Sequence, residues 1–177
     1  MNTEYEVRVL EIDYEKIILK LKELGAEFKG EYNQKRYVYN TIPKCDGKWI
    51  RLRTNGKNTT LTYKSVEKET IDGTKELEVE VSDFEKTNEL LNLAGIKSKA
   101  YQENKRIQYV LDGVEIDIDF WPLIPAYLEV EGKSEESVLK IIEKLGLEKN
   151  KVIALDVQSV YENVYGIDIS KITALKF

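Results

Sequence analysis

The chain has 177 residues with one cysteine and no histidine, and it carries a formal net charge of −5 at pH 7. The lack of histidine excludes Ser-His-Asp hydrolysis and zinc-histidine sites, and the negative charge argues against general binding to nucleic acid or anionic lipid. With a lone cysteine, no signal-type apolar N-terminus and no membrane-length apolar stretch, we expect a cytoplasmic protein without an intrachain disulfide.

The predicted elements begin with a strand, because EYEVRV at 4–9 alternates polar and apolar side chains. A helical stretch follows from Tyr14 and stops at Gly25, since glycine favours the left-handed residue that ends a helix. A long strand with QKRYVY at 34–39 and two more strands at 49–54 and 59–64 complete this part.

The same order of elements then repeats. ELEVEV at 76–81 resembles the first strand, and a helical stretch runs from Phe84 to Gly95. The remaining strands of this copy are NKRIQYV at 104–110, 114–120 and 126–131, and helical segments follow at about 134–145 and 156–165. We therefore expect one domain over residues 1–177, built from two strand-helix-strand-strand-strand halves.

Charged side chains occupy one face of most of these strands. They are Glu4, Glu6 and Arg8; Arg51 and Arg53; Lys64 beside Thr62; Glu76, Glu78 and Glu80; Glu115, Asp117 and Asp119; and Glu129 and Glu131. On a single strand such a face is usually the solvated side of an open antiparallel sheet. Repeated over six or more strands, it favours a closed barrel with the charges inside and the apolar faces outside. We predict an α+β fold: an eight-stranded antiparallel closed β-barrel, or tunnel, with helices packed outside.

Charges of both signs inside a barrel need a ligand, because buried charge is unfavourable unless it is paired. A polyphosphate with a divalent metal satisfies both sets. Guanidinium and ammonium groups bind phosphoryl oxygens, and carboxylates bind hard cations such as Mg²⁺ or Mn²⁺. The predicted phosphate-binding residues are Arg8, Arg51, Arg53, Lys64, Lys105 and Arg106, and the predicted metal ligands are Glu4, Glu6, Glu129 and Glu131.

The ordered series of these motifs resembles the CYTH domain, also called the triphosphate tunnel metalloenzyme superfamily. The series comprises E-x-E-x-R (Glu4 to Arg8), R-x-R (Arg51, Arg53), Thr62 with Lys64, E-x-E (Glu78, Glu80), Lys105-Arg106, D-x-D (Asp117, Asp119), E-x-E (Glu129, Glu131) and SVYENV at 159–164. The resemblance covers residues 4 to about 165. It implies a tunnel that binds triphosphate groups with a divalent metal, as in class IV adenylyl cyclases, thiamine triphosphatases and inorganic tripolyphosphatases.

The resemblance also suggests roles for individual residues. Glu4, Glu6, Arg8 and Lys64 are the candidate catalytic residues, and Glu78, Glu80, Asp117 and Asp119 are candidates for holding metal or orienting water. Arg8 stands where the family has lysine, and since arginine stays protonated it can hold phosphate but not accept a proton. Trp121, next to Pro122, either packs under a helix, which we favour, or shapes one tunnel mouth.

Three functions stay open at this point. The first expectation is a metal-dependent hydrolase of tripolyphosphate or of a nucleoside or thiamine triphosphate. The second is an adenylyl cyclase that converts ATP to cyclic AMP and pyrophosphate, and the third is a non-catalytic module that binds triphosphates. We expect a small-molecule substrate and no nucleic-acid or membrane partner, while the oligomeric state, a homodimer included, is left open.

Overall fold

The computed structural model describes residues 1–177, apart from the side chain of residue 149, and its elements follow the predicted order. The first half consists of β1 (Asn2–Val9), α1 (Tyr14–Glu23), β2 (Glu27–Asn40), β3 (Lys48–Thr54) and β4 (Thr59–Val66). The second consists of β5 (Thr74–Glu80), α2 (Phe84–Leu93), β6 (Ser98–Leu111), β7 (Val114–Phe120) and β8 (Tyr127–Gly132). The rest of the chain forms α3 (Glu135–Lys144), η1 (Lys149–Lys151), β9 (Val152–Ile153), α4 (Val157–Ser159), η2 (Val160–Val164), η3 (Ile169–Lys171) and β10 (Ala174–Leu175). The predicted duplication is confirmed.

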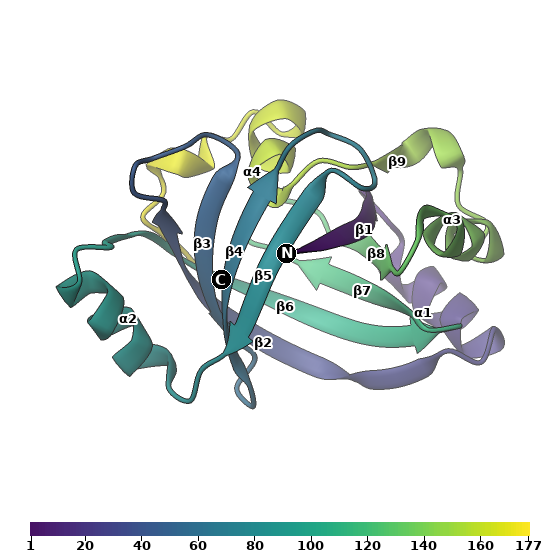
Figure 1. The fold of residues 1–177 in the computed structure, drawn as a ribbon. Helices are drawn as coiled ribbons and strands as arrows, with labels where there is room; N and C mark the ends of the chain where they lie inside the picture. Colours follow the sequence, from purple (N-terminus) through teal and green to yellow (C-terminus); the bar gives the residue numbers. More distant parts are fainter.

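Eight strands close into an antiparallel barrel (Figure 1). Neighbouring strands run β6-β2-β3-β4-β5-β1-β8-β7, and β7 pairs back with β6. The ladder between β1 and β5 is short, from Asn2 to Glu4 on the β1 side, and β9 pairs with β1 further along, at Arg8 and Val9. The closed barrel confirms the predicted fold class. The two-residue strands β9 and β10 were not predicted, because their pairing depends on tertiary contacts and not on a local pattern.

The first two helices begin and end with the local signals that the sequence carries. Asp13 and Asp83 are the N-caps of α1 and α2, and each side chain accepts a hydrogen bond from the backbone N–H three residues later. Gly25 and Gly95 follow the last turns with φ of 74° and 89°, a conformation that glycine adopts without strain. No helix of the described chain is long and apolar enough to cross a membrane.

The later helices agree with the prediction in part. Ser134 caps α3 as expected, with its side chain accepting from the Ser137 N–H. The helix expected over 156–165 is instead a three-residue α-helix, α4, followed by a π-helix, η2. Val160 and Tyr161, which are adjacent, are both fully buried there. A π-helix is rare and is not marked by the apolar pattern of a sequence, so this irregular turn was not predicted.

The hydrophobic core lies outside the barrel, between the outward faces of the strands and the helices. One cluster joins β1, β7 and β8 to α1 and α3, and it includes Val7, Ile116, Ile118, Leu128, Val130, Leu21, Ile141 and Ile142. A smaller cluster holds α2 against β2 and β3 through Leu91, Tyr39 and Leu52. The placement of the helices outside the barrel is thereby confirmed, and the inward faces of the strands are left for polar residues.

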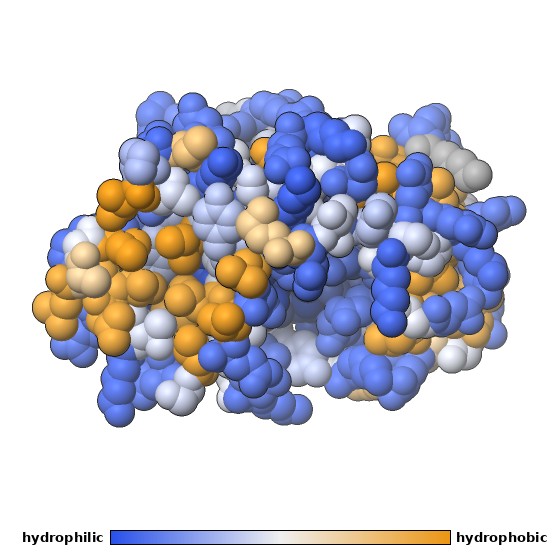
Figure 2. Space-filling view, viewed as in Figure 1, coloured by the Kyte–Doolittle hydropathy of each residue, from blue (hydrophilic) through white to orange (hydrophobic). Residues whose placement is uncertain are grey.

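Apolar side chains remain in solvent beside α2, on the left of Figure 2. Leu77 and Val79 on β5 are 56% and 51% exposed, and Leu90 and Leu93 on α2 are 64% and 81% exposed. The two halves are therefore covered unequally, because α1 and α3 cover their part of the barrel more fully.

Candidate functional site

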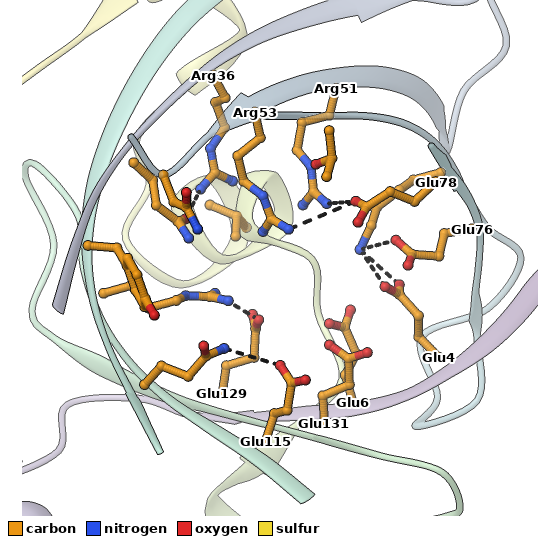
Figure 3. Close-up of a pocket in the computed structure, with 18 of the residues that line it drawn as sticks. Glu4, Glu6, Arg36, Arg51, Arg53, Glu76, Glu78, Glu115, Glu129 and Glu131 are labelled. Atoms are coloured by element: carbon orange, nitrogen blue, oxygen red, sulfur yellow. Dashed lines mark hydrogen bonds and ion pairs between the residues drawn. The ribbon is translucent and has the colours of Figure 1, made fainter. Parts of the chain in front are cut away.

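A cavity of about 430 Å³ is enclosed by the inward faces of the strands (Figure 3). Its charged lining consists of Glu4, Glu6, Glu76, Glu78, Glu80, Glu115, Glu129 and Glu131 together with Arg8, Arg36, Arg51, Arg53, Lys64 and Arg106. The cause is strand alternation: Glu4, Glu6 and Arg8 face inward and are buried, while Val7 and Val9 pack outward in the core. The predicted inward orientation of the β1 charges is confirmed.

Three carboxylates meet on one side of the cavity. Glu6, Glu129 and Glu131 each place an oxygen within 4.8 Å of the others. The register sets Glu6 of β1 directly opposite Glu131 of β8, and like charges in such a pair are destabilising unless a cation lies between them. Burial, together with the charges of Glu4, Glu129 and Glu6, raises the pKa of Glu131 to about 8. This crowded all-oxygen set fits a hard divalent cation.

Glu4 lies beside these three carboxylates but is engaged by Lys64. The Lys64 Nζ donates to both Glu4 oxygens, at 2.9 and 2.8 Å, and lies 3.6 Å from Glu76. Burial raises the pKa of Glu4 and the Lys64 ammonium opposes that rise. Glu4 is therefore held at the edge of the acidic group by a cation from β4.

Both terminal nitrogens of Arg8 donate to protein partners, while its buried Nε has none. Its Nη2 donates to Glu129 at 2.5 Å and to Glu6 at 3.4 Å, and its Nη1 donates to the carbonyl of Leu155 at 2.6 Å. Burial works against the charged guanidinium, yet these carboxylates raise the pKa of Arg8 well above its ordinary value. The pKa of Glu129 is lowered, because Arg8 and Arg106 outweigh its burial. Arg8 thus positions two carboxylates of the acidic group.

Arg106 on β6 has a carboxylate partner at each of its three nitrogens. It donates to Asp119 from Nε and Nη2, at 2.9 and 2.5 Å, to Asp117 at 2.5 Å and to Glu129 at 2.9 Å. Both aspartates lie behind this guanidinium and are buried, and neither lines the cavity. Burial raises the pKa of Asp117 to about 7, although Arg106 opposes the rise.

The opposite side of the cavity is basic. Arg51 and Arg53 on β3 share one carboxylate, Glu78 of β5, at 3.6 and 3.9 Å, and Thr62 also donates to it at 2.6 Å. The Arg51 charge, with burial, lowers the pKa of Arg53 to about 10, so Arg53 is still protonated at neutral pH. Two arginines with one distant carboxylate between them keep donors available to an anion.

Arg36 on β2 completes this basic side. Its guanidinium is buried, stacks on the Trp121 ring at 4.5 Å and donates from Nη2 to the amide oxygens of Gln34 and Asn104, at 3.1 and 2.5 Å. Burial, followed by the charges of Arg51 and Arg53, lowers its pKa well below the ordinary value. Figure 3 shows Arg36, Arg51 and Arg53 pointing into the cavity across from Glu6, Glu129 and Glu131.

A family model described as the CYTH domain matches residues 2–158. The chain belongs to the CYTH family. The resemblance inferred from the motif series is thereby confirmed, and the match spans all eight strands of the barrel.

Individual proteins are similar to this chain over most of its length. MJ0240 of Methanocaldococcus jannaschii, whose adenylate cyclase designation is provisional, is 26% identical over 163 residues, covering 85% of this chain and 93% of that protein. PH1012 of Pyrococcus horikoshii OT3 is 27% identical with a TM-score of 0.74, over 86% of this chain and 96% of that structure. A Vibrio parahaemolyticus structure, also provisionally named an adenylate cyclase, has a TM-score of 0.78 at 14% identity, over 91% of this chain and 98% of that one, which shows a shared fold.

Most predicted site residues lie at the CYTH cavity, with three exceptions. Asp117 and Asp119 are behind Arg106, as described above. The prediction that Lys105 binds phosphate is corrected: Lys105 is exposed on the outer face of β6, where its Nζ lies 4.9 Å from the Phe177 ring centroid. The reason is alternation, since Lys105 and Arg106 are neighbours on a strand and cannot both face inward.

The prediction left out Arg36 and Glu76, both of which line the cavity. The repeat contained the signal for Arg36, because QKR at 34–36 aligns with NKR at 104–106 and Arg106 was selected. Trp121 packs in a core cluster with Tyr161, as favoured, and its ring also lines the cavity beside Arg36.

Proposed function

We propose that this CYTH protein is a divalent-metal-dependent hydrolase of substrates that contain a triphosphate group. The observation that carries the proposal is the pairing of two opposed surfaces in one cavity. Glu6, Glu129 and Glu131 converge on one side, and guanidinium groups led by Arg51 and Arg53 converge on the other. A polyphosphate that bridges a hard cation neutralises both sides at once.

Glu6, Glu129 and Glu131 would hold Mg²⁺ or Mn²⁺, while Glu4, also predicted as a ligand, is outside this close group and is paired with Lys64. The bound ion would supply charge neutralisation at the phosphoryl oxygens, which is the main catalytic requirement in phosphoryl transfer. Arg8 and Arg106 keep this set in place, since both are bonded to Glu129.

The protein's own part in the reaction is binding, orientation and proton transfer. Arg51 and Arg53 hold phosphoryl oxygens so that a water can approach in line with the bridging P–O bond. The water oxygen bonds to phosphorus, the bridging P–O bond breaks, and the proton of the water passes to a carboxylate of the acidic side. Arg8 has no part in that proton transfer, because it remains a cation.

An adenylyl cyclase is the second candidate, and the name of the Methanocaldococcus relative favours it. Cyclisation requires a place for adenine next to the triphosphate, and such places are lined by apolar or aromatic groups. Within the described lining, the apolar and aromatic side chains are Tyr32, Trp121, Tyr127 and Val157, and Trp121 is already stacked by Arg36. A related fold from Hippeastrum, 15% identical, is described as a provisional adenylyl cyclase with a dominant triphosphatase activity. We therefore place hydrolysis first.

The test is a product assay with Mg²⁺ or Mn²⁺ and tripolyphosphate, ATP or thiamine triphosphate. Phosphate release supports hydrolysis, cyclic AMP with pyrophosphate supports the cyclase, and saturable binding without either product supports a binding module. The variant Arg51→Ala with Arg53→Ala should weaken tripolyphosphate binding far more than orthophosphate binding, because the longer anion spans more of the basic side. Lys35→Ala with Lys105→Ala is the matched control, since it removes two exposed positive charges outside the barrel. Equal losses in the two double variants would refute the site.

A further inference from the structure

Arg36 is a buried cation with no ionic partner among the residues that the structure describes. Arg36 is 6% exposed, and its guanidinium donates only to the neutral amides of Gln34 and Asn104. A buried charge is normally compensated by an opposite charge, so this arrangement is unfavourable in the free protein. The negative charge that compensates Arg36 must therefore come from a group other than the described side chains.

Its neighbours make the imbalance larger. The β2–β3 register sets Arg36 directly opposite Arg53, and like charges in such cross-strand pairs are destabilising. Arg51, two residues from Arg53 on the same inward face, adds a third guanidinium, and all three point into the cavity. Three guanidinium groups that share only the carboxylate of Glu78, which is paired with Arg51 and Arg53, form a site for a multiply charged anion.

Arg36 is also held in one orientation. The guanidinium carbon lies over the Trp121 ring, 4.5 Å from its centroid, and Asn104, which accepts from Arg36, donates to Asp119 at 3.0 Å. The hydrogen bonds to protein use Nη2 alone, which leaves Nη1 for a ligand. Pre-organisation of this kind reduces the entropy lost when a forked contact to an oxyanion forms.

Resting on the proposed function, we propose that Arg36, with Arg51 and Arg53, binds the terminal phosphoryl group of the substrate and thereby selects for open-chain triphosphates. A terminal phosphoryl carries up to two charges and three unshared oxygens, whereas an internal one carries a single charge and two. Three convergent guanidinium groups match the terminal group. The rest of the chain then extends towards the acidic side and its metal.

The test measures binding of tripolyphosphate and of trimetaphosphate, a ring of three phosphoryl groups without an end, by calorimetry and by thermal shift without metal. Arg36→Gln should weaken tripolyphosphate binding by about 10-fold to 100-fold, as expected for a charge-assisted hydrogen bond of ~1.5–3 kcal/mol, and trimetaphosphate binding by much less. Arg36→Lys should fall in between, because it keeps the charge but not the fork. Lys35→Gln, next along β2 and exposed, is the control and should bind like the wild type.

A merely structural role for Arg36 makes a different prediction. It would lower the melting temperature of the free protein in Arg36→Gln, whereas we expect that temperature to hold or rise, since an uncompensated cation is removed. Equal losses on the two anions, or tripolyphosphate binding equal to that of Lys35→Gln, would overturn the inference. If the wild type does not bind trimetaphosphate at all, its selection for open-chain triphosphates is shown directly. The loss of tripolyphosphate binding in Arg36→Gln then decides whether Arg36 has the proposed role.

The outcomes also separate this inference from the proposed hydrolysis. Product release by the wild type with unchanged tripolyphosphate binding in Arg36→Gln would remove only the role of Arg36. The expected binding pattern without product release would keep the role of Arg36 and remove the hydrolase.

Discussion

The two halves of the barrel share one order of elements but contribute unequally to the charge of the cavity: five of its six basic residues come from the first half and six of its eight glutamates from the second. Arg36 and Arg106 occupy matching places in the repeat, on β2 and β6. The strand next to Arg36 sets Arg53 opposite it, whereas the strand next to Arg106 sets Asp119 there. One guanidinium is thus left to a ligand and the other is neutralised by protein. The comparison indicates that the cross-strand partner, and not the position in the repeat, determines whether a buried arginine is neutralised by the protein or is left for a ligand.

The largest effect should come from removing the saturated arginine. Arg106→Gln leaves Asp117, Asp119 and Glu129 buried without their cation, and breaking such a group destabilises a protein by ~3–5 kcal/mol. Urea unfolding of the variant and of Arg36→Gln measures the contrast, since the latter should lose no stability. Similar losses in the two variants would remove the distinction between the halves.

The second-largest effect should come from removing the carboxylates that are proposed to bind the metal. Glu6→Gln with Glu131→Gln should abolish the thermal stabilisation by Mg²⁺ or Mn²⁺, which for the wild type is about 2.7 kcal/mol at 100 times the dissociation constant. The free variant should be at least as stable as the wild type, because the opposed carboxylates are relieved. Glu69→Gln with Glu89→Gln removes two exposed carboxylates as a control. A metal response retained in the first variant would place the cation elsewhere.

A more gradual effect is expected from pH. The pKa of Glu131 in the folded protein is about 8, against an ordinary value of 4.5, so the folded state holds a proton that the unfolded state has released. The resulting stability is complete below about pH 4.5 and is lost as pH rises through 8, with a slope of up to ~1.4 kcal/mol per pH unit. Unfolding at pH 5.5, 7 and 8.5 should show this decline without metal, and Glu131→Gln should flatten it. Parallel curves would contradict the assignment.

The smallest effect should come from Lys105. Lys105→Gln should change stability by less than ~0.5 kcal/mol and leave tripolyphosphate binding unchanged, because the side chain is exposed on the outer face of β6. Direct titration with tripolyphosphate checks this expectation. Weaker binding would mean that the outer surface also steers the anion.

Much of the architecture could be predicted because a strand has a period of two. The alternation in EYEVRV and WIRLRT places charges on one face and apolar residues on the other, and the repeated order of elements indicates how many strands close. Lys105 was misplaced because a run of two basic residues does not say which of them faces inward. The register of a neighbouring strand is needed to decide that.

The pairing of the charges could not be predicted. Arg8 meets Glu129 across 121 residues of sequence. The residues directly across from Arg36 on its two neighbouring strands are Arg53 and Gln102, neither of which is a carboxylate. Such contacts depend on long-range register, which local patterns do not contain. The π-helix η2 likewise has no mark in the apolar pattern, because α3 buries two successive residues, Ile141 and Ile142, in a regular α-helix.

The short ladder between β1 and β5 affects how the protein assembles during synthesis. β1 is made first, yet one of its edges pairs with β8, near residue 130, and the other pairs with β5 near residue 75 and with β9 beyond residue 150. Distant partners of this kind slow folding, so β1 leaves the ribosome long before its edges are covered. Charged side chains on a waiting strand oppose pairing with other nascent chains. Glu4, Glu6 and Arg8 would thus oppose aggregation of the nascent chain before they line the cavity of the folded protein.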